Sequence, residues 1–310
     1  MPRLSIVIPT TRGRPLTRVL ARLAAQTMPA ETFEVIVVAD AREGDPDAVA
    51  TEVGERPFAV RTLAARVPGA SAARNVGWNA AEAPLVLFMG DDTLAAPGLV
   101  GEHLAWHEEH PEETVGVLGH VRWADEIQVT PFMRWLDSGI QFDFSSIAGV
   151  EAGWGRLYTA NVSLKRSMLA RVGGFDEDLP FLYEDLDLGK RMAEHGFTLL
   201  YNRAAEVEHL HPVTLEGFRP RVALTARMER LFVAKHPDVP PYFLRIYRTA
   251  ARQAPARGRG VRLARFVGPR VPWLGPRVWT SVDAYYRQAL APTFLAAWEE
   301  SEVGSASSAA

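Results

Sequence analysis

A short apolar run that stops at two carboxylates constrains the fold more than any other feature of the sequence. Residues 85–89 (LVLFM) follow Pro84 and precede Gly90, Asp91 and Asp92. An apolar run of this length predicts a strand that is buried on both faces of a parallel sheet. Ligands of open α/β sheets bind beyond the carboxyl ends of such strands. Two adjacent carboxylates there need a cation or hydrogen-bond donors to compensate them, which indicates a divalent metal site for an anionic ligand.

The first two thirds of the chain alternate strand-like and helix-like segments. Apolar runs predict strands at residues 4–9, 35–40, 58–64, 85–89 and 197–201. Helical spacing of apolar residues predicts helices at residues 15–28, 45–53, 71–83, 97–109 and 184–195. This order predicts an α/β fold with a Rossmann-like, mostly parallel central sheet that is flanked by helices.

Two segments depart from this alternation. Residues 115–163 carry scattered aromatic side chains and several glycines, and we interpret them as a long loop that recognises a second substrate. Beyond Thr214 the sequence has a helical pattern and is rich in arginine. We therefore expect a catalytic domain at residues 1–235, a basic helical C-terminal extension at residues 236–300 and a disordered tail at residues 301–310.

Composition narrows the possible functions and locations. The formal net charge is -3, so overall charge gives no reason to expect binding to nucleic acid. The chain has no cysteine, which excludes disulfides, thiolate metal sites and cysteine nucleophiles. It shows no signal-peptide pattern and no apolar stretch of the roughly 18 residues that span a bilayer. We expect a cytoplasmic protein, with peripheral contact at the inner face of the membrane as a further option.

Two further polar segments follow predicted strands. Asp40 ends the second strand, where a carboxylate can accept a hydrogen bond from a nucleotide base or ribose; the alternative is a turn residue. The loop from Thr10 to Arg14 follows the first strand and could place backbone donors and guanidinium groups near a phosphate or base. It matches neither standard phosphate-binding glycine pattern, and a solvated turn is equally compatible with it.

Small residues surround Arg74 and Asn75 at the start of a predicted helix, in residues 68–77. Small side chains let a helix approach a sheet closely, and they also let a ligand approach the backbone. Arg74 could pair with a diphosphate or with Asp92. The alternative is a tightly packed surface helix with an exposed arginine.

Three carboxylates, those of Glu184, Asp185 and Asp187, fall in the first turn of another predicted helix. Acids at this end complement the helix dipole, which is one explanation for them. The functional alternative makes one of them a general base, since a hydroxyl is a poor nucleophile until a base removes its proton.

His209 and His211 share one face if their segment is extended, because side chains alternate along a strand. Two imidazoles so placed can bind one metal ion, or one can bind while the other supports it. The acidic metal site predicted elsewhere in the chain favours ligation over a structural role.

Taken in order along the chain, these motifs resemble the family 2 glycosyltransferases of the GT-A fold. The matching segments are Ser5–Thr10, Val35–Asp40, Gly69–Gly77, Phe88–Thr93, Gly174–Asp176, Glu184–Asp185 with Leu188 and Arg191, and the region of His209. The resemblance covers about residues 4–235. It implies an inverting, metal-dependent enzyme that moves one sugar from a nucleoside diphosphate sugar to an acceptor hydroxyl, in glycan or glycolipid biosynthesis.

The resemblance also implies roles for particular residues. Asp40 would contact the nucleobase, and Asp92, helped by the histidines at 209 and 211, would hold Mg²⁺ or Mn²⁺ against the diphosphate. Asp185, with Glu184 beside it, would deprotonate the acceptor, which is a glycan, a lipid-linked sugar or a small molecule. The remaining donor contacts would come from Pro9, Thr10, Arg12, Arg74, Asn75 and Asp91.

The chain departs from the family at one position. The family often has an Asp-x-Asp pattern, whereas Gly90 stands at the first acidic position here, so either Asp91 substitutes for it or water completes the shell around Asp92. The Gln-x-x-Arg-Trp motif and membrane spans of processive members are missing from the sequence, which favours transfer of a single sugar. Aromatic and arginine residues near Trp273 and Trp279 suggest solvated helices or, alternatively, a surface for a lipid-linked acceptor.

Two other function classes compete with this interpretation. A sugar-nucleotide nucleotidyltransferase shares the α/β frame, but it should have a glycine-rich basic loop after the first strand, and residues 12–14 lack the glycine run. A catalytically silent glycan- or nucleotide-binding relative is suggested by Gly90. The presence of Asp92, Asp185 and His209 argues against that loss of catalysis.

Overall fold

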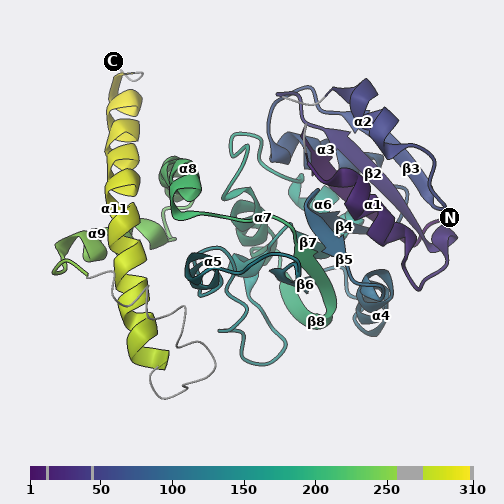
Figure 1. Cartoon of the computed structure of the whole chain (residues 1–310). Coiled ribbons are helices and arrows are strands. Elements are labelled where there is room, and N and C mark those ends of the chain that lie inside the picture. Colours follow the sequence, from purple (N-terminus) through teal and green to yellow (C-terminus); the bar gives the residue numbers. More distant parts are fainter. Residues whose placement is uncertain (12–13, 43–44, 257–274, 308–310) are drawn as a thin grey trace. The chain divides into compact units, whose positions relative to one another are not determined.

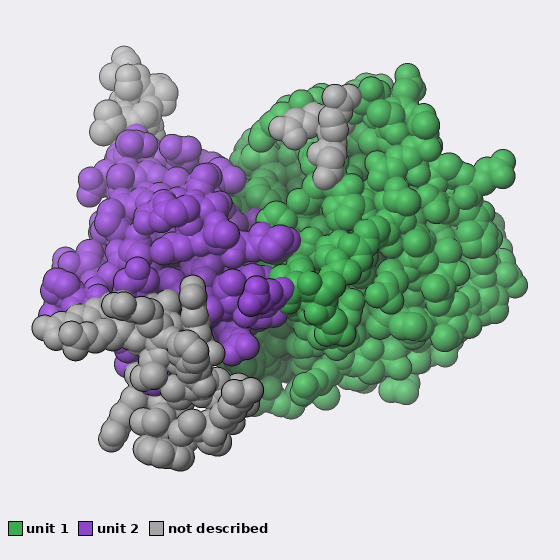
Figure 2. Space-filling view, viewed as in Figure 1, with its two compact units in different colours: residues 1–127, 142–211 green, residues 128–141, 212–310 purple. Residues whose placement is uncertain are grey.

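The computed structural model describes residues 1–11, 14–42, 45–256 and 275–307. The chain forms two compact units (Figure 2), of which the first comprises residues 1–127 and 142–211 and the second comprises residues 128–141 and 212–310. Within the described ranges, no helix is long and apolar enough to cross a membrane.

The first unit is built on one sheet, whose described strands have the order β3-β2-β1-β4-β7-β6-β8-β5 (Figure 1). The strands are β1 (Leu4–Thr10), β2 (Phe33–Ala39), β3 (Ala59–Ala64), β4 (Leu85–Met89), β5 (Thr93–Ala95), β6 (Val115–Trp123), β7 (Asn161–Lys165) and β8 (Thr198–His209). The first four strands are parallel, and β6 is parallel to β8. β7 and β5 run antiparallel to their neighbours. The predicted α/β fold with a mostly parallel sheet is confirmed.

Helices cover both faces of this sheet because its central strands bury side chains on both sides. α1 (Leu16–Ala24), α2 (Pro46–Val53) and α4 (Leu99–Glu109) pack on one face, whereas α3 (Ala70–Ala80), α6 (Arg166–Val172) and α7 (Glu184–Ala193) pack on the other. Along β1, Ile6 and Ile8 enter the first core and Val7 enters the second. Short 3-10 helices lie at η1 (Ala30–Thr32) and η2 (Trp154–Arg156).

The interpretation of residues 115–163 as one long loop is wrong, since β6 and β7 lie in this range and are inner strands of the sheet. The glycines that suggested a loop mark close approaches instead. A Cβ atom at Gly116 would lie 2.6 Å from the ring of Phe197. At Gly119 it would lie 2.1 Å from the side-chain nitrogen of Asn161. Glycine therefore makes room for neighbouring strands here.

β8 continues to His209, beyond the predicted end at Tyr201. Its pairing with β6 shifts register, because Gly119 pairs with Asn202 while the next residue of β6 pairs with Glu206. Residues 203–205 are thus left out of the ladder as a bulge. Arg203 in this bulge, with Asn202 before it and Glu206 after it, interrupts the apolar run, so a pattern based on apolar runs missed the second half of the strand.

The second unit is helical. Its helices are α5 (Pro131–Leu136), α8 (Leu215–Lys235), α9 (Tyr242–Arg252) and α11 (Gly275–Ser307). The ring of Phe132 packs against Phe218 and Tyr286, with centroids 5.6 and 5.0 Å apart. The indole nitrogen of Trp135 donates a hydrogen bond to Asp283 at 2.9 Å. These contacts attach residues 128–141 to the C-terminal helices.

The boundaries of the compact units differ from the predicted domains. The first unit ends at His211 rather than at residue 235, because α8 packs on α11 within the helical unit. The tail predicted to be disordered is helical as far as Ser307, at the end of α11. Residues 308–310 lie outside the described residues.

Candidate active site

The two carboxylates after β4 lie beside the end of β1, because β1 and β4 are parallel neighbours. The hydroxyl of Thr10 donates a hydrogen bond to Asp91 Oδ2 at 2.9 Å. The guanidinium of Arg14 donates from Nε to Asp91 Oδ1 at 2.9 Å, and its Nη2 donates to Asp92 Oδ2. Both carboxylate side chains are only 10% exposed. Donors from the segment after β1 thus satisfy the carboxylate pair.

A short antiparallel pairing brings His209 to Asp92. β5 starts directly after Asp92, and its first residue, Thr93, pairs with His209 at the end of β8. The amide of Leu210 donates to the carbonyl oxygen of Asp92 at 2.8 Å. As a result, His209 Nε2 lies 3.3 Å from Asp92 Oδ2, although the two residues are far apart in the sequence. Trp123 stacks on the His209 ring with centroids 5.2 Å apart and fixes its plane.

The two carboxylates differ electrostatically. Burial raises the pKa of Asp92, but its hydrogen bond to His209 and the charges of His209 and Arg14 outweigh burial and hold that pKa at about 2. Burial also raises the pKa of Asp91, and there the opposing effect of Arg14 does not outweigh it. Asp92 is therefore the more firmly ionised of the pair.

Asp92 and His209 fit a divalent cation. Carboxylate oxygens suit Mg²⁺ and Mn²⁺, and an imidazole nitrogen is a common ligand of divalent transition metals; one of each lies here within 3.3 Å of the other. Within the described residues, no group of three or more acidic, histidine or cysteine side chains is placed to hold a metal. His211 is exposed, and its ring stacks on His209 with centroids 5.8 Å apart. It therefore adds no third ligand to the pair as the structure stands.

Gly90 leaves the space that the Asp92 carboxylate occupies. A Cβ atom at position 90 would lie 2.9 Å from Asp92 Oδ1 and 3.2 Å from Thr93 Cγ2. A side chain at this position would push the Asp92 carboxylate aside. The glycine that replaces the first acid of the family's Asp-x-Asp pattern therefore allows the Asp92 carboxylate to take its observed position.

Asp40 at the end of β2 is buried and bonded to backbone. Its Oδ1 accepts from the amide of Arg42 at 2.8 Å, and its Oδ2 accepts from the amide of Gly69 at 2.7 Å. The first contact is the turn arrangement considered as an alternative for Asp40. Gly69 caps α3 at a φ of 123°, and a Cβ there would lie 2.6 Å from Pro180. Asp40 thus joins β2 to the start of α3.

Arg74 contacts Glu184 rather than Asp92. Arg74 Nη1 donates to Glu184 Oε1 at 2.8 Å, and both side chains are buried. Asn75 is also occupied: its amide accepts from Phe175 N and donates to Phe175 O, each at 2.9 Å. Both residues, predicted to bind the donor, fasten α3 to the segment that leads into α7.

The three acids of α7 have different environments. Glu184 is 3% exposed and Asp187 is 1% exposed and paired with Arg191, whereas Asp185 is partly exposed. Of the two predicted catalytic acids, only Asp185 is open to a ligand. Burial raises the pKa of Tyr158, and the charge of Asp185 adds to this effect, so the phenol lies near that carboxylate.

The backbone before these acids is strained. Leu182 and Tyr183 both have φ near 67°, a left-handed conformation that is rare for residues other than glycine. Strain of this kind persists only where surrounding contacts impose it, and it is frequent at functional sites.

Sequence reasoning selected Arg12 from the loop after β1, and that residue lies outside the described residues. The structure instead brings Arg14, considered for the same loop but not selected, onto both carboxylates. Pro9 pairs with Val38 within the sheet, one residue before Thr10. Trp123 was not predicted to contribute to the site, and its sequence context, with Arg122 directly before it, gave no cue to this role.

A sheet of this topology, with carboxylates at the carboxyl ends of β2 and β4 and helices on both faces, is the GT-A fold. The model of the family described as glycosyltransferase like family 2 matches residues 2–223, and the chain belongs to this family.

Two curated relatives match most of this chain, but the match covers only part of their own length. The chain is 31% identical over 281 residues to the validoxylamine A glucosyltransferase of Streptomyces hygroscopicus subsp. jinggangensis (strain 5008), and the match covers 78% of this chain and 63% of the relative. The validoxylamine A glucosyltransferase of Streptomyces hygroscopicus subsp. limoneus is also 31% identical, and there the match covers 58% of the relative. The chain thus spans about three fifths of the length of these relatives.

Solved structures share the fold at low identity. A mannosyltransferase from Pyrobaculum calidifontis in complex with GDP-Man and Mn²⁺ has a TM-score of 0.61 and 19% identity, over 95% of this chain and 87% of that chain. A fragment of S. aureus TarS in complex with UDP has a TM-score of 0.54 and 17% identity, over 98% of this chain and 92% of that chain.

Proposed function

We propose that the chain is an inverting glycosyltransferase that moves one sugar from a nucleoside diphosphate sugar to an acceptor hydroxyl with Mg²⁺ or Mn²⁺. The observation that carries this proposal is the convergence of Asp92 and His209 at the carboxyl edge of the sheet. The names of the relatives support it, since a glucosyltransferase and a mannosyltransferase complex with GDP-Man and Mn²⁺ are among the similar proteins.

In the proposed donor site, Asp40 lies at the base end and Asp92 with His209 at the diphosphate end. A bound divalent cation supplies charge stabilisation to the departing nucleoside diphosphate. Thr10, at the end of β1, and Asp91, just after the neighbouring strand β4, line the same edge of the sheet.

Asp185 is the proposed general base. It takes the proton of the acceptor hydroxyl while the oxygen forms a bond to the anomeric carbon of the donor, and the bond from that carbon to the diphosphate oxygen breaks. Attack from the face opposite the leaving group inverts the configuration. Glu184 has a positioning role in this proposal. Its buried ion pair with Arg74 fixes the first turn of α7, which also carries Asp185.

Binding and transfer can be tested separately. Wild type should bind one of the UDP-, GDP- or dTDP-sugars in the presence of Mn²⁺, measured by calorimetry, and should release the nucleoside diphosphate when an acceptor is present. Asp92→Ala should weaken binding, whereas Asp185→Asn should keep binding and lose transfer. Asp47→Ala, at an exposed acid on α2, is the control and should change neither.

The same assay addresses the competing functions. Release of pyrophosphate from a nucleoside triphosphate and a sugar 1-phosphate, supplied in place of the sugar nucleotide, would indicate a nucleotidyltransferase. Binding of a sugar nucleotide with no turnover for any acceptor would indicate a silent relative. If no sugar nucleotide binds with Mn²⁺ present, the proposed function is wrong.

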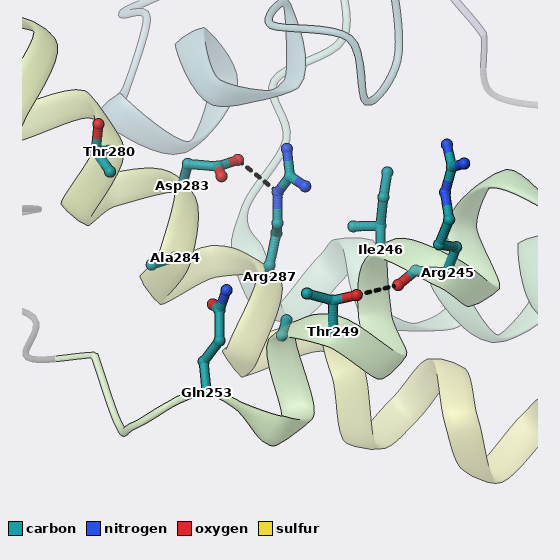
Figure 3. Close-up of a pocket in the computed structure, with 9 residues that line it drawn as sticks. Arg245, Ile246, Thr249, Gln253, Thr280, Asp283, Ala284 and Arg287 are labelled. Atoms are coloured by element: carbon teal, nitrogen blue, oxygen red, sulfur yellow. Dashed lines mark hydrogen bonds and ion pairs between the residues drawn. The ribbon is translucent and has the colours of Figure 1, made fainter.

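A peripheral membrane contact through the second unit is a further part of the proposal. Arg245, Arg248 and Arg252 lie three and four residues apart on α9, so they share its exposed face. A groove of about 330 Å³ lies beside them, and Arg245 and Arg287 both line it (Figure 3). Asp283 also lines this groove and pairs with Arg287, so the uncompensated positive charge there comes from Arg245. Together with the exposed arginines of α9, it suits an anionic headgroup or a lipid-linked phosphate.

Vesicle sedimentation tests this contact. Wild type should bind vesicles that contain phosphatidylglycerol and not vesicles of phosphatidylcholine alone. The double variant Arg245→Gln/Arg252→Gln should lose most of this binding, while Arg3→Gln/Arg18→Gln, at exposed arginines of the first unit, should retain it. Equal loss in both variants would show a general charge effect and contradict the assignment.

A further inference from the structure

Arg14 bonds the same carboxylate oxygen, Asp92 Oδ2, that a metal ion at Asp92 and His209 would bind. It stands immediately before Pro15 and α1, and its guanidinium reaches Asp91 through Nε and Asp92 through Nη2. Asp92 Oδ2 is the oxygen that Arg14 bonds, and the same oxygen lies 3.3 Å from His209 Nε2. The guanidinium therefore occupies the oxygen through which Asp92 and His209 would share a divalent cation.

The two cations exclude each other at this oxygen. A guanidinium and a divalent ion that contact one carboxylate oxygen at once repel each other in a site with low water access. Arg14 and a bound metal would therefore compete for Asp92. Arg14 compensates part of the negative charge of the carboxylate pair, and a bound metal would take over that compensation.

Arg14 has a second anion available after this exchange. Asp91 keeps donors other than Arg14, because the hydroxyl of Thr10 and the amide of Thr11 both donate to its Oδ2, at 2.9 and 3.4 Å. Arg14 is 29% exposed, more than either carboxylate, so its outer nitrogens can turn toward a ligand. A guanidinium that turns from a carboxylate finds an equivalent partner in a phosphate, since both accept its planar pair of donors.

We propose that Arg14 is a positioning residue that exchanges partners when the donor binds. Without donor it bonds Asp92 and holds the carboxylate pair in place; with the metal and the nucleoside diphosphate bound it releases Asp92 and contacts the diphosphate. This inference rests on the proposed function, since it requires a diphosphate beside Asp92.

The exchange couples metal binding to nucleotide binding. Metal alone has to displace Arg14 with no new partner for it, whereas metal together with nucleotide gives the displaced arginine a phosphate. Each ligand should therefore strengthen the binding of the other, and Arg14 should carry part of that coupling.

The test measures Mn²⁺ binding directly, through the loss of the free Mn²⁺ signal in electron paramagnetic resonance, first without nucleotide and then with UDP, GDP or dTDP. In Arg14→Gln, Mn²⁺ alone should bind on the order of tenfold more tightly than in wild type. The affinity for the nucleoside diphosphate at saturating Mn²⁺ should fall by about the same factor. Arg14→Lys keeps the positive charge but not the planar pair of guanidinium donors. Its affinities for Mn²⁺ and for the nucleoside diphosphate should lie between those of wild type and of Arg14→Gln.

A merely structural role would move both affinities in the same direction, so the opposite signs are the diagnostic result. Arg18→Gln is the matched control, because Arg18 is an exposed arginine of α1 that pairs with Glu126 away from the carboxylates. It should leave both affinities unchanged. Thermal unfolding with and without Mn²⁺ checks folding, and Mn²⁺ should raise the melting temperature more in Arg14→Gln than in wild type.

Unchanged or weaker Mn²⁺ binding in Arg14→Gln and in Arg14→Lys, with nucleotide binding intact in wild type, overturns the exchange alone. A wild-type protein that binds neither Mn²⁺ nor any of the three nucleoside diphosphates overturns the donor site itself.

Discussion

Lowering the pH should destabilise the first unit through two buried histidines that take no part in the proposed chemistry. His103 on α4 is fully buried; its Nδ1 lies 2.8 Å from Ser163 Oγ and its Nε2 lies 2.9 Å from Asn161 Oδ1. His107 Nε2 lies 2.8 Å from the same hydroxyl. The amide nitrogen of Asn161 donates to Ala205 O, which fixes Oδ1 as the acceptor for His103.

These contacts are satisfied when each ring carries one proton. His103 donates from Nε2 to Asn161 and accepts from the hydroxyl of Ser163, which in turn accepts from His107 Nε2. Burial lowers the pKa of His103 from 6.5 to about 4 and that of His107 to about 3. The unfolded chain therefore binds more protons than the folded one, and stability is full above pH 6.5 and falls as the pH drops toward these lower values.

The expected loss of stability follows from the lowered pKa values of the two histidines. Between pH 7 and pH 5, His103 contributes a decrease of about 2 kcal/mol in the free energy of unfolding, and His107 contributes a similar amount, or about 4 kcal/mol for the pair. Urea unfolding followed by circular dichroism at both pH values measures this difference. The variant His103→Gln/His107→Gln should show a much smaller pH dependence, while His195→Gln, at an exposed histidine, should behave like wild type.

The reasoning would be refuted if wild type and the double variant lost equal stability between pH 7 and pH 5. A variant too unstable to measure at pH 5 can be replaced by His107→Gln alone, for which about half of the pH dependence should remain.

Three further substitutions test contacts of the first unit. Arg74→Met removes one partner of a buried ion pair and leaves Glu184 unpaired, so it should lower the free energy of unfolding by about 3–5 kcal/mol in urea titrations. Gly90→Ala should displace the Asp92 carboxylate and weaken Mn²⁺ binding in calorimetry with little change in melting temperature, because a flexible side chain gives way; unchanged Mn²⁺ affinity would contradict this. Gly119→Ala meets a backbone oxygen at 2.4 Å, so a large loss of melting temperature is expected, and a stable variant would show that the strands separate easily.

The apolar pattern predicted β1, β2 and β4 because each is a short run buried on both faces. It also predicted β3, whose residues are only partly buried or exposed. β1, β2 and β4 lie within a residue or two of the predicted ranges. β6 was missed because Gly116 and Gly119 serve contacts with neighbouring strands, which a local pattern does not contain.

The site was only partly accessible to sequence reasoning for the same reason. The types and order of residues pointed to Asp92 and His209. The partner of Arg74 could not be predicted in this way, because it is a glutamate 110 positions away. The choice between Arg12 and Arg14 depends on the path of the loop, which a local pattern does not give. The buried pair His103 and His107 gave no signal, since its partners come from β7, inside the range interpreted as a loop.

The left-handed backbone at Leu182 and Tyr183 has a consequence for engineering. Each such residue costs on the order of 1–2 kcal/mol relative to glycine, which adopts this conformation freely. Leu182→Gly would therefore be a natural choice for raising thermal stability. The same freedom would loosen the chain just ahead of α7, so a more heat-resistant enzyme is expected to be a slower one.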